Sequence, residues 1–245
     1  MNLVVDIGNS FLKIYIFEEG QLIHFQQNRI SERLRNPEYF YEMKSLSGAI
    51  VSSVSTVPGA LIRLFKDLKI NYLILDHNTP LPIKNLYKTP ETLGKDRLAA
   101  VVGAYNIYTQ HNVLAVDAGT ALTFDFINYK GEYLGGNISP GLEMRFRALN
   151  FFTKKLPLLE KADEVHLIGT NTREAIIAGV QNGIAYEIDM YIDKLRELYT
   201  DLKVILTGGD TFFFEHKLKN TIFAEPNLVA IGLNNILRYN VENCK

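Results

Sequence analysis

The sequence predicts an α/β protein built from two similar domains that arose by duplication. Strand-forming segments come first and helix-forming segments follow, and this order occurs twice along the 245 residues. An internal repeat supports the duplication, since residues 3–20 align without a gap with residues 114–131 and share six identical positions. We therefore expect a first domain at residues 1–111, a second at residues 112–245, and a cleft between them.

The elements of the first half follow from hydrophobic periodicity. Leu61, Leu64, Phe65 and Leu68 have helical spacing, for example, whereas residues 3–17 alternate as the two strands of a hairpin do. The full set comprises the hairpin at residues 3–17, a strand at 22–27, helices at 31–44, 60–68 and 96–108, strands at 49–53 and 72–75, and a loop at 77–93.

The second half repeats this plan and adds a long helix. Residues 112–116 begin the second hairpin, and a glycine-rich section at 135–141 leads into a helix at 142–149. A helical region follows at 172–198, with a break expected near Gly183. The chain then forms a strand at 203–207 and a closing helix at 230–239.

Composition restricts the classes of function. With 26 basic and 27 acidic residues the net charge is −1, which predicts neither a nucleic-acid nor a membrane-surface partner. Cys244 is the single cysteine, so an intrachain disulfide and a cysteine metal cage are excluded. No apolar run approaches the ~20 residues that span a bilayer. We expect a soluble cytoplasmic protein.

The two hairpin tips carry most of the polar residues of the repeat. The first tip contains Asp6, Gly8, Asn9 and Ser10, and the second reads Asp117-Ala-Gly-Thr120. Glycine lets backbone amides approach an anion, and an aspartate at a strand end can hold a cation or a water. Two facing tips would clamp a phosphate; the alternatives are two ordinary hairpins, or the Asp-x-Gly-Thr loop of an aspartic protease, which the helical content disfavours.

Two further features are consistent with a nucleotide. Lys13 shares a strand face with Phe11 and Tyr15, so its ammonium group needs an anionic partner or must reach water. It is therefore either a phosphate contact or a lysine on an edge strand. Gly208 and Gly209 follow an apolar strand. Either their exposed backbone lies against a flat ring, or they simply form a turn.

The segment from Gly94 to Arg97 opens a predicted helix. Asp96 could cap that helix or act as a general base, and the residues alone favour neither role. Arg97 opposes the helix dipole at this position, which suggests an anionic ligand.

Common nucleotide and metal signatures are missing from the sequence. There is no Gly-x-x-x-x-Gly-Lys loop, no Gly-x-Gly-x-x-Gly fingerprint, and no paired His or Cys spacing for a metal. The five histidines are scattered, and the run Phe212–Phe214 is expected in the core.

In their joint order, the motifs closely resemble type III pantothenate kinases of the acetate kinase, sugar kinase, Hsp70 and actin superfamily. The resemblance runs essentially end to end. It rests on Asp6-x-Gly-Asn-Ser with Lys13, Asn85-x-Tyr87, Gly94-x-Asp96-Arg97, Asp117-Ala-Gly-Thr-Ala-x-Thr, Gly135-Gly-x-Ile-x-Pro-Gly141, Gly169-x-Asn-Thr172, Thr207-Gly-Gly-Asp210 and Glu225-Pro-x-Leu.

The resemblance implies two actin-like (ribonuclease H-like) domains and ATP-dependent phosphorylation of pantothenate, the opening reaction of coenzyme A biosynthesis. By similarity Asp96 is the general base, and Asp117 binds a monovalent cation, K⁺ or NH₄⁺. The resemblance also implies a requirement for Mg²⁺. The family is a homodimer. The implied ATP contacts are Asp6, Gly8, Asn9, Ser10, Lys13, Thr120, Gly208 and Gly209, and the implied pantothenate contacts are Tyr87, Gly94, Lys95, Asp96, Arg97 and Thr172.

The sequence departs from the family at two positions. Lys95 stands where a small or apolar residue is usual, and Ser10 replaces the commoner threonine but keeps the hydroxyl. Two other functions remain open: a different kinase or a phosphatase of the same superfamily, and a nucleotide-binding regulator without catalysis. The presence of Asp6, Asp96, Asp117 and Thr120 argues against the inactive regulator.

Overall fold

The computed structural model describes residues 1–8, 11–29 and 46–243. The helix expected at residues 31–44 and the predicted ATP contacts Asn9 and Ser10 lie outside these described residues. The chain divides into two compact units, which are described separately. Unit 1 contains Met1–Asn106 and Leu228–Lys245, and unit 2 contains Ile107–Asn227.

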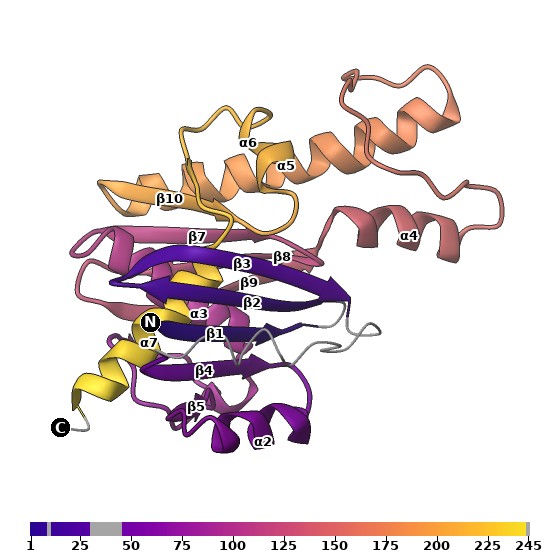
Figure 1. Cartoon of the computed structure of the whole chain (residues 1–245). Helices are drawn as coiled ribbons and strands as arrows, with labels where there is room; N and C mark the ends of the chain where they lie inside the picture. The colour runs from indigo at the N-terminus through magenta and orange to yellow at the C-terminus, as the bar shows by residue number, and fades with distance from the viewer. Residues whose placement is uncertain (9–10, 30–45, 244–245) are drawn as a thin grey trace. The chain divides into compact units, whose positions relative to one another are not determined.

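Unit 1 contains a mixed sheet with strand order β3-β2-β1-β4-β5 (Figure 1). Strand β1 pairs antiparallel with β2 and parallel with β4, so it lies in the middle of the sheet. Strand β4 is buried along its whole length, as expected for a strand covered on both faces. The bounds are β1 Asn2–Ile7, β2 Phe11–Glu18, β3 Gln21–Arg29, β4 Gly48–Ser53 and β5 Tyr72–Ile74.

Helices cover both faces of this sheet. Helix α2 (Gly59–Asp67) buries Leu61, Leu64 and Phe65 in a cluster with β1, β2 and β4. Helices α3 (Lys95–Ile107) and α7 (Leu228–Asn243) join a second cluster with residues of β1, β2 and β4 that point the other way. The short elements β6 (Lys84–Asn85) and η2 (Pro90–Thr92) precede α3.

The C-terminal helix α7 packs in unit 1, although the sequence analysis assigned it to the second domain. Its contact with α3 is very close, because a Cβ atom on Gly232 would lie 1.8 Å from the carbonyl oxygen of Ala99. A Cβ on Gly103 would likewise lie 2.4 Å from the carbonyl oxygen of Leu228. Glycine on each helix therefore permits the approach. The expected boundary at 111/112 lies near the observed change of unit at 106/107.

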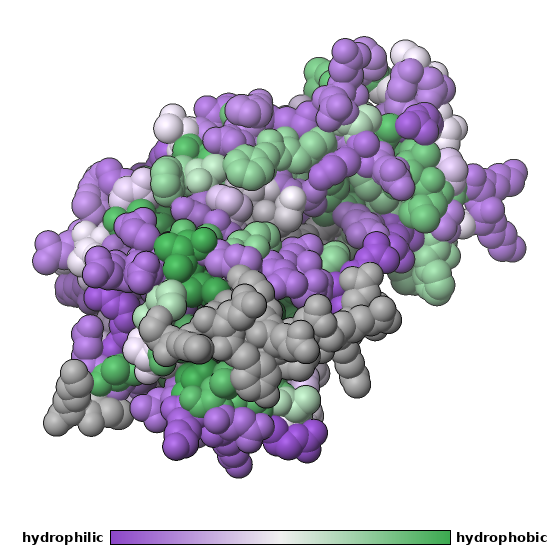
Figure 2. All heavy atoms as spheres, in the orientation of Figure 1, coloured by the Kyte–Doolittle hydropathy of each residue, from purple (hydrophilic) through white to green (hydrophobic). Residues whose placement is uncertain are grey.

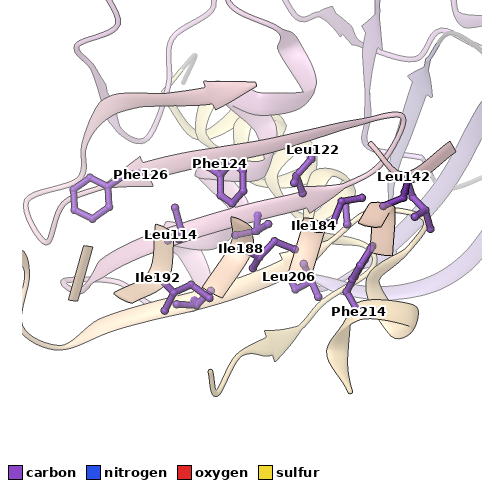
Figure 3. Close-up of a cluster of buried hydrophobic side chains, with 14 of the residues drawn as sticks. Leu114, Leu122, Phe124, Phe126, Leu142, Ile184, Ile188, Ile192, Leu206 and Phe214 are labelled. Carbon is purple, nitrogen blue, oxygen red and sulfur yellow. The ribbon is translucent and has the colours of Figure 1, made fainter. Parts of the chain in front are cut away.

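In unit 2 the strands lie in the order β11-β10-β7-β8-β9. Strand β7 pairs antiparallel with β8 and parallel with β10, which repeats the arrangement around β1. Helix α5 packs Ile184, Ile188 and Ile192 against this sheet (Figure 3). The bounds are β7 Asn112–Ala118, β8 Ala121–Ile127, β9 Glu132–Pro140, α4 Leu142–Phe152, α5 Thr172–Leu198, β10 Leu202–Thr207, α6 Thr211–Glu215 and β11 Phe223–Ala224.

Helix α5 begins and ends where the sequence predicts, but it is continuous through Gly183, so the expected break there is wrong. The glycine-rich section 135–141 contributes most of strand β9 and was not recognised as a strand. Of the three consecutive phenylalanines, Phe214 is buried as expected, whereas Phe212 is 64% exposed. No helix in the described part of the chain is long and apolar enough to cross a membrane.

Candidate functional site

In unit 1, Asp6 lies near the end of β1 between two polar neighbours. Strand register places Lys13 of β2 opposite it on one side and Ser52 of β4 on the other. Sequence reasoning identified Lys13 but missed Ser52, because the pairing of β1 with β4 joins segments far apart in the chain.

Burial raises the pKa of the Asp6 carboxyl above its usual value. The positive charge of Lys13 and a hydrogen bond with Ser52 lower that pKa in part, while the nearby carboxylate of Asp96 raises it further. Asp6 also helps to raise the pKa of the buried Tyr15 phenol, for which burial is the larger cause. Asp6, Lys13 and Asp96 are therefore close enough to interact electrostatically.

Asp96 is not the N-cap of helix α3. The Leu98 N–H donates to the Gly94 carbonyl at 3.1 Å, so Gly94 holds the capping position and Lys95 begins the helix. Asp96 lies in the first turn, where its Oδ1 accepts the Arg97 N–H at 2.8 Å. The carboxylate folds back so far that a Cβ on Gly94 would lie 2.5 Å from it. The capping role that the sequence left open is thus filled by Gly94.

Lys95, whose role the sequence left uncertain, contacts the neighbouring strand. Its Nζ donates to the Ser53 carbonyl at 3.1 Å. This bond joins the start of α3 to the end of β4, and therefore holds Asp96 near the strand that flanks Asp6.

Arg97 and Tyr87, both predicted substrate contacts, lie against each other. The Arg97 guanidinium lies 5.6 Å from the centre of the Tyr87 ring, and the Arg97 side chain is buried. An Asn85 side-chain oxygen accepts the Tyr87 N–H at 3.0 Å and fixes the turn. A buried cation in the first turn of a helix opposes the helix dipole, so an anionic ligand would stabilise it.

In unit 2, Asp117 lies near the end of β7 beside two glycine-containing loops. A Cβ on Gly119 would lie 2.9 Å from its Oδ1, and a Cβ on Gly208 would lie 2.3 Å from the same atom. Gly208 also has a φ of +97°, which disfavours other residues. The Asp210 N–H donates to the Ala118 carbonyl at 3.0 Å, so the loop after β10 is fixed against the β7–β8 tip.

The two hairpins differ in length, which the gapless alignment concealed. Lys13 lies opposite Asp6 in the first hairpin, whereas Thr123 lies opposite Asp117 in the second. The gapless offset would instead pair Asp117 with Phe124, whose side chain is buried in the core. The second tip is one residue shorter, and the residue facing its aspartate is uncharged.

Thr172 begins helix α5 and lines a cavity of about 710 Å³ in unit 2. Asn171 caps the helix by accepting the Glu174 N–H at 3.0 Å, and the Glu174 carboxylate accepts the Thr170 N–H and hydroxyl. These hydrogen bonds lower the pKa of the Glu174 carboxyl. The cavity walls are otherwise mostly apolar and come from α4, α5 and the end of β9.

Sequence reasoning also missed Lys161 in unit 2. Its Nζ lies 2.5 Å from an Asp210 carboxylate oxygen and 5.0 Å from the centre of the Phe213 ring. Nothing in the local sequence around Lys161 indicates this pairing, because 49 residues separate the two partners. Among residues 1–8, 11–29 and 46–243, no three His, Cys, Asp or Glu side chains gather as a metal-binding cluster.

Solved structures identify the fold. A Campylobacter jejuni protein described as a Baf family transcriptional activator matches with a TM-score of 0.66 at 24% identity, covering 98% of this chain and 99% of that one. A Listeria monocytogenes protein described as an N-acetylmannosamine kinase gives 0.55 at 14% identity over 100% and 99%. The ROK hexokinase of Thermus thermophilus gives 0.51 at 10% identity over 98% and 99%. The fold is therefore the actin-like α/β fold found in these sugar kinases.

Sequence relatives narrow the class to one family. The profile of the type III pantothenate kinase family matches residues 2–194. A type III pantothenate kinase of Phocaeicola vulgatus is 47% identical over 240 residues, which cover 98% of this chain and 99% of the relative. One from Bacteroides fragilis is 43% identical over 242 residues, with 98% of both chains covered. The chain belongs to the type III pantothenate kinase family.

The raised pKa of Asp6 generates a stability prediction. A carboxyl whose pKa is higher in the folded than in the unfolded state destabilises the fold once the pH exceeds the unfolded value, which is 3.8. We expect Asp6→Asn to raise Tm at pH 7 by about 2 °C or more. The gain should shrink as the pH falls and vanish below about pH 4, where Asp6 is protonated in both states.

Thermal melts of the wild-type and Asp6→Asn proteins from pH 4 to pH 8 test this expectation. Asp76→Asn serves as the control of opposite sign: hydrogen bonds from Asn78 and Thr79 lower the pKa of the Asp76 carboxyl, so this variant should have a lower Tm than the wild type at pH 7. A lower Tm for Asp6→Asn at pH 7 would contradict the predicted cost of the buried charge.

Proposed function

We propose that this pantothenate kinase transfers the γ-phosphoryl group of ATP to the primary hydroxyl of pantothenate and forms 4′-phosphopantothenate, the first product of coenzyme A biosynthesis. One structural observation carries the assignment of the acceptor site. The first turn of α3 presents a carboxylate, Asp96, beside a buried cation, Arg97, that contacts Tyr87. A small acceptor that bears both a hydroxyl and a carboxylate matches this pair.

On the acceptor side, Asp96 is the general base that receives the hydroxyl proton. Arg97 binds the pantothenate carboxylate, since a guanidinium and a carboxylate form paired, charge-assisted hydrogen bonds. Tyr87, Gly94 and Thr172 complete the pantothenate contacts. Lys95 acts through its bond to the Ser53 carbonyl, which holds the start of α3 in place.

On the nucleotide side, Lys13 compensates phosphate charge, and the backbone around Gly8 and Thr120 donates to phosphate oxygens. Gly208 and Gly209 offer exposed backbone to the nucleotide, and a Cβ on Gly209 would meet nothing within 4 Å. In-line phosphoryl transfer depends on positioning and charge neutralisation more than on covalent chemistry. Asn9 and Ser10 belong to the same proposed set.

Two carboxylates are candidates to hold the cations that the family resemblance implies. Asp6 is a partly buried carboxylate with a cationic and a hydroxyl neighbour, which suits Mg²⁺ carried by the nucleotide phosphates. Asp117, near the end of β7 and beside the glycine-containing loops at Gly119 and Gly208, would hold K⁺ or NH₄⁺. Bound Mg²⁺ would neutralise the charge that develops on the transferred phosphoryl group.

No comparison favours the two alternatives, another small-molecule kinase or phosphatase and an inactive regulator. Curated relatives that match almost the whole chain, such as those of Phocaeicola vulgatus and Bacteroides fragilis, are type III pantothenate kinases. A cytoplasmic location stays a prediction from the sequence.

We further propose that the enzyme is a homodimer. Helices α4 and α5 leave large apolar side chains exposed, and Figure 2 shows hydrophobic surface in green at the right, where Figure 1 places α4. Phe151 and Phe152 are 80% and 82% exposed, and Met190 is 55% exposed. A second copy of the chain that covers these side chains would remove them from water.

Light scattering tests the dimer. The wild-type protein should have twice the mass of the 27.8 kDa chain. Phe151→Ser with Phe152→Ser should shift the protein toward monomer, whereas Phe212→Ser, which alters an exposed phenylalanine of α6, should not. A wild-type monomer with full activity would exclude the proposal.

Asp96→Asn should abolish most of the catalytic rate and leave the fold intact. The amide oxygen can still accept the Arg97 N–H, but it cannot take the hydroxyl proton. Removing a general base lowers kcat by about 10²–10⁴-fold. Coupled ATP and pantothenate assays with Glu91→Gln as the control measure this change; a variant with more than about half of the wild-type kcat would exclude Asp96 as the base.

Activity should depend on K⁺ or NH₄⁺, and Na⁺ should substitute poorly because its smaller radius demands tighter coordination. Asp117→Asn should raise the K⁺ concentration needed for half-maximal rate by about tenfold, as expected when a charged ligand is lost. Initial rates against KCl, balanced with choline chloride, measure this dependence.

Asp201→Asn is the matched control for the potassium series. Asp201 is exposed and has a φ of +59°, a backbone conformation that asparagine also adopts. An unchanged K⁺ curve in Asp117→Asn would place the ion elsewhere, and a flat wild-type curve would mean that no such ion is needed.

A further inference from the structure

The β7–β8 tip rests on the junction between β9 and α4. A Cβ on Gly141 would lie 2.4 Å from the carbonyl oxygens of both Gly119 and Thr120, so the two backbones are in direct contact. The path of residues 139–141 therefore sets where the tip lies. Any side chain that fixes this junction also fixes Gly119 and Thr120.

Arg145 of α4 fixes the junction with a single guanidinium. Its Nε donates to the Pro140 carbonyl at 2.8 Å, and one terminal nitrogen donates to the Ser139 hydroxyl at 3.0 Å. The same nitrogen forms an ion pair with Glu187 of α5. Three contacts from one rigid, planar group define an orientation that a flexible ammonium group would not define.

The surroundings favour this arrangement. The Arg145 and Glu187 side chains are 21% and 24% exposed, so solvent screens their interaction only in part. Gly183 of α5 lies near the guanidinium, since a Cβ there would be 3.9 Å from one of its terminal nitrogens. Helix α5 is thus linked through Glu187 and Arg145 to the segment that supports the tip.

We propose that Arg145, oriented by Glu187, is a positioning residue for nucleotide binding: it fixes residues 139–141 and, through Gly141, the Gly119–Thr120 tip. The inference rests on the proposed function, because it assumes that this tip contacts the ATP phosphates. Backbone and hydroxyl donors to a phosphate must be held within about half an ångström of their working positions. Loosening the junction should therefore weaken binding of ATP.

Helix α4 offers a matched control. Arg147 forms an ion pair with Glu143 on the same helix, but these side chains are 68% and 75% exposed. Arg147→Met removes the same charge from the same helix as Arg145→Met. It leaves the hydrogen bonds to Ser139 and Pro140 intact.

The experiment measures kcat, the KM for ATP and the KM for pantothenate in the full-length enzyme. Arg145→Met should raise the KM for ATP by about fivefold or more, while Arg147→Met leaves it unchanged. Arg145→Lys keeps the charge but loses the planar fork, so it should remain impaired. Arg145 also lines the cavity beside Thr172, so the KM for pantothenate reports on that competing role.

A double-mutant cycle then tests the route through the tip. If Arg145 acts by positioning the tip, Arg145→Met should raise the KM for ATP by a smaller factor in the Thr120→Ala background than in the wild type, because the Thr120 hydroxyl is one of the donors that it positions. Fully additive effects would overturn the proposal. So would full recovery in Arg145→Lys, equal losses in Arg147→Met, or a larger rise in the KM for pantothenate than for ATP.

The Ser139→Ala variant and a calorimetric titration with ATP complete the experiment. If Arg145→Met does not fold, Ser139→Ala removes one of the three contacts and should still raise the KM for ATP; an unchanged KM there would overturn the proposal. A wild-type enzyme that does not phosphorylate pantothenate would refute the proposed function. In that case, calorimetric titration with ATP tests the role of Arg145 directly. Weaker ATP binding in Arg145→Met than in the wild type would support the inference, and equal binding would overturn it.

Discussion

The strand arrangement around β1 and β7 is the constraint on which the proposed chemistry depends. Each of these strands has an antiparallel hairpin partner on one side and a parallel neighbour on the other. An aspartate near the strand end therefore has a hairpin residue on one side and a residue from a distant strand on the other. For Asp6 these neighbours are Lys13 and Ser52, and for Asp117 the parallel neighbour is Thr207.

The two units use this arrangement differently, because their hairpins differ by one residue. A residue added to a tip shifts the cross-strand partner of the aspartate by one position and so changes the face that each side chain occupies. Lys13 faces Asp6 in unit 1, and a threonine occupies the corresponding place in unit 2. The two units thus keep an aspartate at the equivalent strand end but differ in the residue that faces it across the hairpin.

The features that the sequence predicts well are local, and those it misses are not. Helix α5 has the expected bounds, because the Thr170, Asn171 and Glu174 capping bonds lie within five consecutive residues. The packing of α7 in unit 1 depends on Gly232 meeting Ala99, more than a hundred residues away, and no periodicity reveals it. Ser52 beside Asp6 is concealed for a similar reason, because β1 and β4 are not consecutive in the chain. The gapless alignment concealed the shorter second tip, because both tips contain glycine.

Several residues of the candidate site oppose stability, and this distinguishes them from structural residues nearby. Burial raises the pKa of Asp6, and Arg97 places a buried cation against a helix dipole. Lys95, two positions before Arg97 in the chain, instead donates to a strand carbonyl, and Arg145 makes three favourable contacts. A protein retains unfavourable charges where a ligand compensates them. For Asp6 that cost is the burial of its carboxyl group, which the positive charge of Lys13 and the hydrogen bond with Ser52 offset only in part.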